Sequence, residues 1–178
     1  MQKGYLIWLT GLPSSGKTTI ARRIEAHLKA KGFKVELLDG DEVRKWLSPE
    51  AGFSREDRER HLRRVAYVSK LLVRNGVAVL ASFVSPYRNV RDEARRIIEA
   101  EGFKFIEVYV KCSVEECIRR DPKALYAKAM RGEIGDMTGI QDVYEEPLNP
   151  EVVVDSERED VDECAEKVLN KLKELNLI

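Results

Sequence analysis

An eight-residue segment from Gly11 to Thr18, with the sequence GLPSSGKT, has the residue types and spacing of a phosphate-binding loop. Glycine lets the backbone N–H groups of such a loop turn inward around an anion, and a helix that follows adds the positive end of its dipole. We expect Lys17 to contact the β- and γ-phosphates of a nucleotide and the Thr18 hydroxyl to bind Mg²⁺. The alternative is an ordinary glycine-rich turn between a strand and a helix.

A second polar segment, Asp39 to Arg44, directly follows an expected strand at 34–38. Ligands bind beyond the carboxyl ends of parallel strands, so these side chains are expected at the ligand edge of the sheet. One of the two carboxylates, Asp41 better than Asp39, could orient an acceptor hydroxyl or hold a magnesium-bound water, and Arg44 could neutralise an acidic substrate. A helix N-cap formed by Asp39 or Asp41 is the alternative, and it is compatible with a catalytic role.

A third segment, Ser82 to Arg88, follows another expected strand but lacks the aspartate with which motor-type ATPases bind magnesium. We therefore expect Mg²⁺ to rely on Thr18, the ATP oxygens, water and Asp41, as suits a small-molecule kinase. Ser85 could donate a hydrogen bond to a substrate, act as a nucleophile, or simply form a turn before Pro86.

Arg58 and His61 stand three residues apart in an expected helix at 55–75, on the face that meets the sheet. Polar groups in that position cost free energy unless they are paired. A bound anion would satisfy them, and a buried ion pair with Asp39 or Asp57 is the alternative.

Apolar strand patterns alternate with helical ones along the chain, which predicts an α/β fold with parallel strands joined by right-handed crossovers. The expected strands cover residues 5–10, 34–38, 77–83, 105–111 and 151–154. One helix follows the phosphate loop and ends before Gly32, a second occupies 55–75, and the last aligns its apolar residues over 161–175.

Composition limits the possible partners. The chain has 178 residues, enough for one domain with its own core, and 31 Lys+Arg balance 31 Asp+Glu. This balance argues against general nucleic-acid or membrane-surface binding, and no apolar run approaches the length of a membrane span. Three cysteines without metal-ligand spacing are expected to be reduced and at least half-buried, with the cytoplasm as the default compartment.

Six motifs, in order and at matching spacing, resemble those of the adenylyl-sulfate kinase family. They are GLPSSGKT, LDGDEVR at 38–44, GFSREDR at 52–58, SFVSPYR at 82–88, DPKALY at 121–126 and TGI at 138–140. The first is common to the P-loop NTPase superfamily, whereas the combination of the second, third and fourth motifs is specific to this kinase. The resemblance implies a three-layer P-loop fold, with a mostly parallel five-stranded sheet, helices on both faces and a mobile lid. Residues 1–178 would form one kinase domain whose lid spans about 119–145.

The resemblance also implies an activity. The enzyme would transfer the γ-phosphoryl group of ATP to the 3′-hydroxyl of adenosine 5′-phosphosulfate (APS), giving 3′-phosphoadenylyl sulfate and ADP in sulfate assimilation. ATP, Mg²⁺ and a homodimer are implied. A P-loop kinase for a nucleoside monophosphate or a sugar acid remains the alternative. A GTP-dependent switch is a further one, based on the DxxG pattern at 136–139, although no NKxD motif accompanies it.

By the same resemblance, Lys17, Asp41 and Ser85 are the catalytic residues. The ATP-binding set would be Gly11, Leu12, Pro13, Ser14, Ser15, Gly16, Lys17, Thr18, Thr19, Arg120 and Lys123. The set that binds the sulfated substrate would be Asp41, Arg44, Phe53, Arg58, His61, Val84, Ser85, Lys123 and Met137.

Within the substrate set, Phe53 would stack on the substrate adenine, unless it is merely a core aromatic. Arg44 and Arg58 would bind the phosphosulfate. Ser85 occupies the family's phosphoserine position, but direct in-line transfer needs no covalent intermediate, so we expect it to hold the acceptor.

Three positions depart from the family pattern. His61 replaces an asparagine that contacts substrate, Met137 replaces a second stacking phenylalanine, and Met130 replaces an arginine. Met137 could still pack on an adenine face through its sulfur, and the charge of His61 is expected to add a modest pH dependence.

Overall fold

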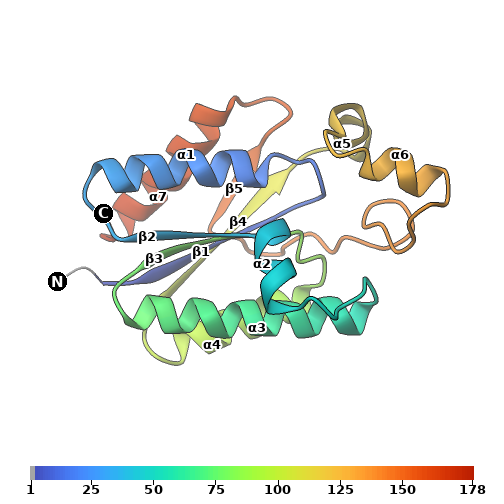
Figure 1. Ribbon diagram of the computed structural model, residues 1–178. Helices are drawn as coiled ribbons and strands as arrows, with labels where there is room; N and C mark the ends of the chain where they lie inside the picture. The colour runs from blue at the N-terminus through green and yellow to red at the C-terminus, as the bar shows by residue number, and fades with distance from the viewer. Residues whose placement is uncertain (1–2) are drawn as a thin grey trace.

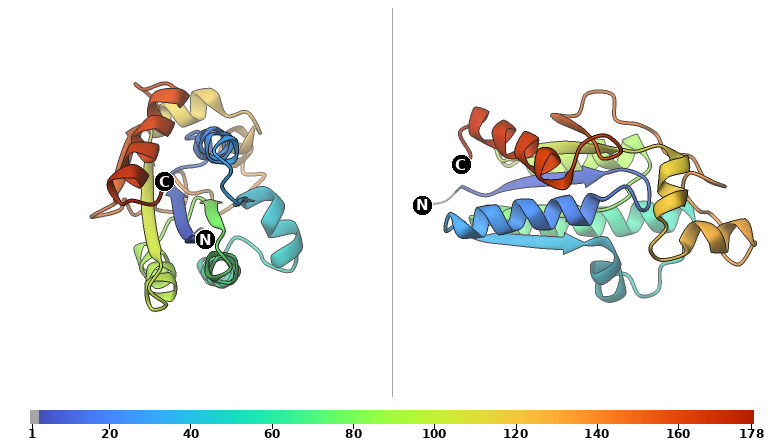
Figure 2. Two further views of the ribbon diagram at one scale, coloured as in Figure 1. Left: turned by 90° about the vertical axis from the view of Figure 1, so that its left-hand side faces the viewer. Right: turned by 90° about the horizontal axis from the view of Figure 1, so that it is seen from above.

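The computed structural model describes residues 3–178, which form a central sheet between two layers of helices (Figures 1 and 2). The five strands are β1 (Tyr5–Thr10), β2 (Val35–Asp39), β3 (Ala78–Ser82), β4 (Lys104–Lys111) and β5 (Val152–Asp155). Their order is β2-β3-β1-β4-β5, and every pair is parallel. The predicted three-layer α/β fold is confirmed, with a sheet that is wholly rather than mostly parallel.

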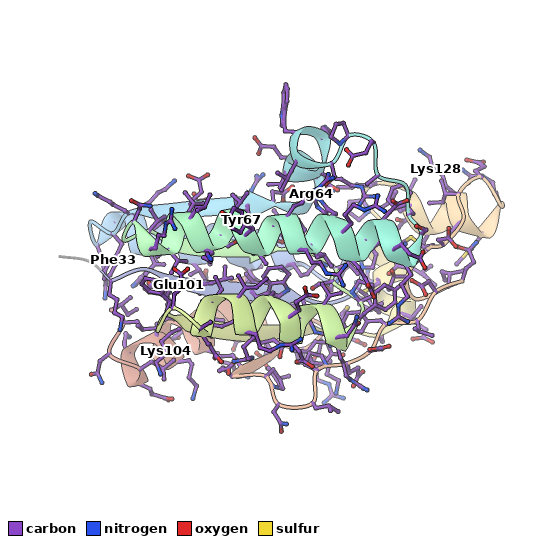
Figure 3. The ribbon with its side chains drawn as sticks, turned by 90° about the horizontal axis from the view of Figure 1, so that it is seen from below. Phe33, Arg64, Tyr67, Glu101, Lys104 and Lys128 are labelled. Atoms are coloured by element: carbon purple, nitrogen blue, oxygen red, sulfur yellow. The ribbon has the colours of Figure 1, made fainter. Side chains whose placement is uncertain are left out.

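Two pairs of helices cover the faces of the sheet. Helices α1 (Lys17–Ala30) and α7 (Val161–Glu174) pack together on one face, and α3 (Arg55–Arg74) and α4 (Arg88–Glu99) pack together on the other (Figure 1). Figure 3 looks directly onto α3 and α4, which lie side by side. The short helices α2 (Gly40–Leu47), α5 (Val114–Arg120) and α6 (Leu125–Met130) stand near the end of the sheet where β1 leads into α1.

Strand β1 is buried on both faces, as expected for the centre of a parallel sheet. Tyr5 and Ile7 point into the cluster under α1 and α7, whereas Leu6 and Trp8 point into the cluster under α3 and α4. This alternation follows from the two-residue period of a strand. The central strand therefore anchors both layers and fixes the position of the loop that follows it.

A third, smaller cluster lies beneath the lid segment and includes two of the cysteines, Cys112 and Cys117. These two and Cys164 are free and buried, which confirms the sequence expectation. Within residues 3–178, no helix combines the length and apolarity needed to cross a bilayer.

Candidate active site

A cavity of about 1350 Å³ opens at the carboxyl ends of β1, β2 and β3. Its walls come from the phosphate loop, from the segments after β2 and β3, from the start of α3, from the lid segment and from the turn after β5. The rule that ligands bind beyond the carboxyl ends of parallel strands is therefore obeyed. The volume exceeds that of a typical single-ligand pocket, so two nucleotides could occupy it together.

The phosphate loop has the backbone that its glycines predict. Gly16 has φ 96° and precedes the first turn of α1, and a Cβ at Gly11 would lie 2.5 Å from the Val110 carbonyl oxygen. Lys17 bends back over the loop, where its Nζ donates to the carbonyl oxygens of Gly11 at 3.0 Å and Leu12 at 2.7 Å. Burial lowers the pKa of Lys17 to about 8. The ammonium therefore already lies at the loop where phosphate would bind.

Thr18 meets two other oxygens at the bottom of the cavity. Its hydroxyl donates to Asp39 Oδ2 at 2.8 Å and lies 3.1 Å from Ser82 Oγ. Asp39 and Ser82 are register partners at the ends of β2 and β3, so sheet pairing brings them together. Hydroxyl and carboxylate oxygens suit Mg²⁺, and this set fits an ion that completes its shell with phosphate oxygens and water.

Asp39 has a second contact, because its Oδ1 accepts from the backbone N–H of Asp41 and Glu42 and so caps α2. Asp41 itself is exposed and forms an ion pair with Lys123 of the lid segment. The predicted cap is thus Asp39. Asp41 lines the cavity and is exposed there. The carboxylate that contacts Thr18 is Asp39, not Asp41 as expected.

Phe53 projects into the cavity and is 60 % exposed, which rules out the core-aromatic alternative. The Arg44 guanidinium lies 4.6 Å from the centre of the ring, and that of Arg58 lies 5.9 Å from it. One aromatic ring and two cations therefore share one wall, an arrangement that could bind a base together with its anionic tail.

The Arg58 guanidinium donates to Phe53 O, to Thr138 Oγ1 at 2.5 Å and to Asp136 O. The expected alternative of a buried ion pair with Asp39 or Asp57 is wrong. The reason is that the first turn of α3 projects past the sheet and reaches the lid segment instead.

His61 lines the cavity and is 3 % exposed; its Nδ1 lies 2.9 Å from Ser48 Oγ, while its buried Nε2 has no hydrogen-bond partner among the described residues. Burial, followed by the nearby Arg44 and Arg64, lowers the pKa of His61 to about 4. Figure 3 shows Arg64 on the side of α3 that faces α2. The expectation that the charge of His61 adds a pH dependence is therefore wrong near neutral pH, where the ring is uncharged.

Ser85 is buried in the cavity wall and has φ 40°. Its hydroxyl accepts from Trp8 Nε1 at 2.9 Å, and the carbonyl of Val84 accepts from Thr10 Oγ1 at 2.8 Å. Both predicted residues thus lie in a wall fixed by side chains of β1.

The lid segment contributes Arg120 and Lys123 to the cavity, as predicted. Arg120 donates to the Ser156 carbonyl at 2.6 Å, and Ser156 Oγ in turn donates to Ser15 O at 2.7 Å, so the lid, the turn after β5 and the phosphate loop are linked. Met137 also lines the cavity but is 7 % exposed, because it packs in the third cluster.

Comparison with known proteins agrees with this geometry. Residues 3–155 match the sequence profile of the family described as adenylylsulphate kinase. The chain belongs to the adenylyl-sulfate kinase family. It is 57 % identical over 157 residues to a probable adenylyl-sulfate kinase of Aeropyrum pernix, covering 88 % of this chain and 86 % of the relative. It is 49 % identical to the adenylyl-sulfate kinase of Halothermothrix orenii, covering 99 % and 94 % of the two chains.

A solved structure is similar throughout. The Mycobacterium tuberculosis APS kinase, crystallised in complex with AMPPNP and APS, superimposes with a TM-score of 0.94 at 39 % identity and covers 97 % of this chain and 99 % of its own. The shared P-loop fold is thus that of an adenylyl-sulfate kinase.

Several predicted adenylyl-sulfate kinase residues lie apart from the cavity wall. Leu12 packs in the third cluster, Gly11 and Ser15 are buried, and Met130, one of the departures from the family pattern, is 57 % exposed outside the cavity. Pro13, Ser14, Gly16, Lys17, Thr18 and Thr19 do line it. Their roles remain predictions.

Two parts of the site differ from the sequence predictions. Asp41 was preferred over Asp39 as the carboxylate near magnesium, and the turn after β5, with Ser156 and the segment 159–161, was not predicted. The same strand-end rule that drew attention to residues after β2 and β3 would have drawn attention to this turn.

Proposed function

We propose that this protein is an ATP-dependent adenylyl-sulfate kinase, which transfers the γ-phosphoryl group of ATP to the 3′-hydroxyl of APS. The observation that carries the proposal is the cavity itself. Its lining includes both the phosphate loop and the wall formed by Arg44, Phe53 and Arg58, and both lie within the part of the chain that matches the family. One cavity of this kind suits direct transfer between two bound nucleotides.

On the ATP side, the loop amides from Gly11 to Thr18 and the ammonium of Lys17 would bind the triphosphate. Mg²⁺, held through Thr18 Oγ1 with Asp39 beside it, would supply charge neutralisation on the phosphate oxygens. Lys17 needs only to exchange its two loop carbonyls for phosphate oxygens, because its ammonium already lies at the loop. The cost of ordering this side chain is thereby small.

On the acceptor side, Phe53 would stack on the adenine of APS, and Arg44 and Arg58 would bind its phosphosulfate. Asp41 would accept the proton of the 3′-hydroxyl as that oxygen attacks the γ-phosphorus, while Lys123 exchanges its ion pair with Asp41 for a phosphate. The buried, fixed position of Ser85 supports a role in holding the acceptor rather than a covalent one.

We further propose that residues 119–145 act as a mobile lid that excludes water. Residues 1–178 would form one kinase domain, of which residues 1–2 lie outside the described part. The enzyme would work as a homodimer in the cytoplasm. The dimer is proposed from the family resemblance. Analytical ultracentrifugation of the purified protein tests it, and a species of single-chain mass would contradict it.

The decisive experiment measures ADP release from magnesium-ATP with APS, AMP, CMP or gluconate as the acceptor. We expect selective stimulation by APS and almost none in Lys17→Ala. Stimulation by AMP, CMP or gluconate instead would favour a nucleoside monophosphate or sugar-acid kinase and would overturn the proposal.

A further inference from the structure

Helix α4 carries an arginine that is almost completely buried and whose contacts reach the cavity wall. Arg91 is 2 % exposed, and its Nε lies 2.9 Å from Glu107 Oε1 on β4. Its Nη1 donates to the Ser85 carbonyl at 2.6 Å, and its Nη2 donates to the Glu145 carbonyl at 2.5 Å. One guanidinium thus joins the sheet, the cavity wall and the chain that returns from the lid segment.

The contact at Ser85 fixes an unusual backbone. With φ 40°, Ser85 lies in the left-handed region, which is strained for a residue with a Cβ. Such a conformation persists only where its surroundings hold it. Trp8 holds the Ser85 hydroxyl and Arg91 holds its carbonyl, so this residue of the wall is secured at both ends.

The contact at Glu145 secures the returning chain. The Glu145 N–H donates to the Pro86 carbonyl at 2.8 Å, and the neighbouring Tyr144 hydroxyl lies 2.8 Å from Thr10 Oγ1. The lid segment therefore rejoins the core against the same wall segment that Arg91 holds. Loss of the guanidinium would therefore remove a hydrogen bond from both segments at once.

We propose that Arg91 is a positioning residue for the phosphoryl acceptor, acting through the carbonyl oxygens of Ser85 and Glu145. The inference rests on the proposed kinase activity but concerns a residue outside the lining of the cavity. Charge-assisted hydrogen bonds in a buried site are stronger and more directional than neutral ones, so they can keep the wall within the narrow tolerance that in-line transfer requires.

Arg95 offers a matched control one helical turn further along α4. It pairs with the same Glu107 at 3.7 Å and with Glu151 at 2.7 Å, but none of its recorded contacts reaches Ser85 or Glu145. A purely structural ion pair predicts similar effects for the two arginines. A positioning role predicts an effect on the acceptor for Arg91 alone.

The test compares Arg91→Met, Arg91→Lys and Arg95→Met by steady-state kinetics and by urea unfolding. We expect Arg91→Met to lower kcat/KM for APS by about tenfold or more relative to Arg95→Met, while KM for ATP changes by less than about twofold. Arg91→Lys should recover part of the loss, because an ammonium can still reach one carbonyl. Equal kinetic effects in Arg91→Met and Arg95→Met would overturn the proposal.

A spectroscopic measurement makes the test independent of turnover. The chain has two tryptophans, and Trp46 is 84 % exposed, so Trp46→Phe leaves Trp8 as the reporter beside Ser85. We expect the Trp8 emission to change in Arg91→Met and not in Arg95→Met. Unchanged emission in both would overturn the proposal.

Two milder variants can replace Arg91→Met. If Arg91→Met does not fold, Arg91→Lys and Glu107→Gln replace it: Glu107→Gln keeps the two carbonyl contacts, so it should spare kcat/KM for APS where Arg91→Lys lowers it. Absence of APS phosphorylation by the wild-type protein would overturn the proposed function. If the wild-type protein is active but Arg91→Met and Arg95→Met have the same kcat/KM for APS, only this inference is overturned.

Discussion

Asp39 and Asp41 stand two residues apart and lie in different surroundings. Asp39 is committed to Thr18 and to the start of α2, whereas Asp41 is exposed and contacts Lys123. We therefore expect Asp41→Asn to lower kcat about 10²-fold or more while KM for ATP hardly changes, because the lost group acts on the acceptor hydroxyl. Glu42→Gln is the matched control on the same exposed turn. Unchanged kcat in Asp41→Asn would remove this residue from catalysis.

The lowered pKa of Lys17 predicts that the affinity for magnesium-ATP depends on pH. At about 8, this pKa lies far below the usual 10.5, because burial disfavours the charged form. Phosphate binds the protonated lysine, so magnesium-ATP affinity should be flat below pH 8 and fall about tenfold per pH unit well above it.

Titration calorimetry at pH 7 and pH 9.5 measures this change in affinity. Lys17→Arg, which stays protonated, should lack the pH dependence. The same loss in both proteins would assign it to another group.

Among the elements, the lid segment makes its contacts with the rest of the protein mostly through side chains. Arg58 reaches Thr138, the Tyr126 hydroxyl donates to Pro13 O at 2.9 Å, and Tyr87 donates to Asp142 at 2.5 Å. A segment held by a small number of such hydrogen bonds opens more easily than a helix packed in the core.

We expect amide hydrogen exchange in residues 119–145 to be fast in the free protein. It should slow markedly when ADP and APS bind, since Arg120 and Lys123 would then contact phosphates. Helix α4, which packs against α3 and the sheet, is the internal control and should not change. Equal protection of the lid segment with and without nucleotides would contradict its assignment as a mobile lid.

At the scale of the whole molecule, the buried neutral His61 predicts that the folded protein becomes less stable as the pH falls. Its pKa is about 4 in the folded protein and 6.5 ordinarily, so between these values the unfolded chain binds a proton that the folded protein does not. Stability is therefore lost as the pH falls from 6.5 towards 4. The loss from this residue should be about 1 to 2 kcal/mol between pH 7 and pH 5.

Urea unfolding of the wild type and of His61→Asn at both pH values measures this effect. The variant should lose less stability on acidification, whatever its absolute stability at pH 7. An identical loss in the two proteins would show that the buried ring does not govern it.

The elements were predictable because each depends on local pattern. Alternation of strands and helices, the glycine spacing at 11–16 and the strand-end rule placed Lys17, Thr18 and Asp41 correctly at one edge of the sheet. The partners of Arg58 were not predictable, because they come from the lid segment about 80 residues later in the chain. The neutral state of His61 was not predictable either, because it depends on burial and on neighbours from α2 and α3.

The sequence by itself determined the fold class, the phosphate loop and the family, because these depend on residue types at short, fixed spacings. Only the tertiary structure decided which carboxylate adjoins Thr18, what holds Ser85 and which arginines share the Phe53 ring. The physical reason is that these contacts join segments far apart in the chain. Their distances are set by strand register and helix packing, which no local pattern of residues encodes.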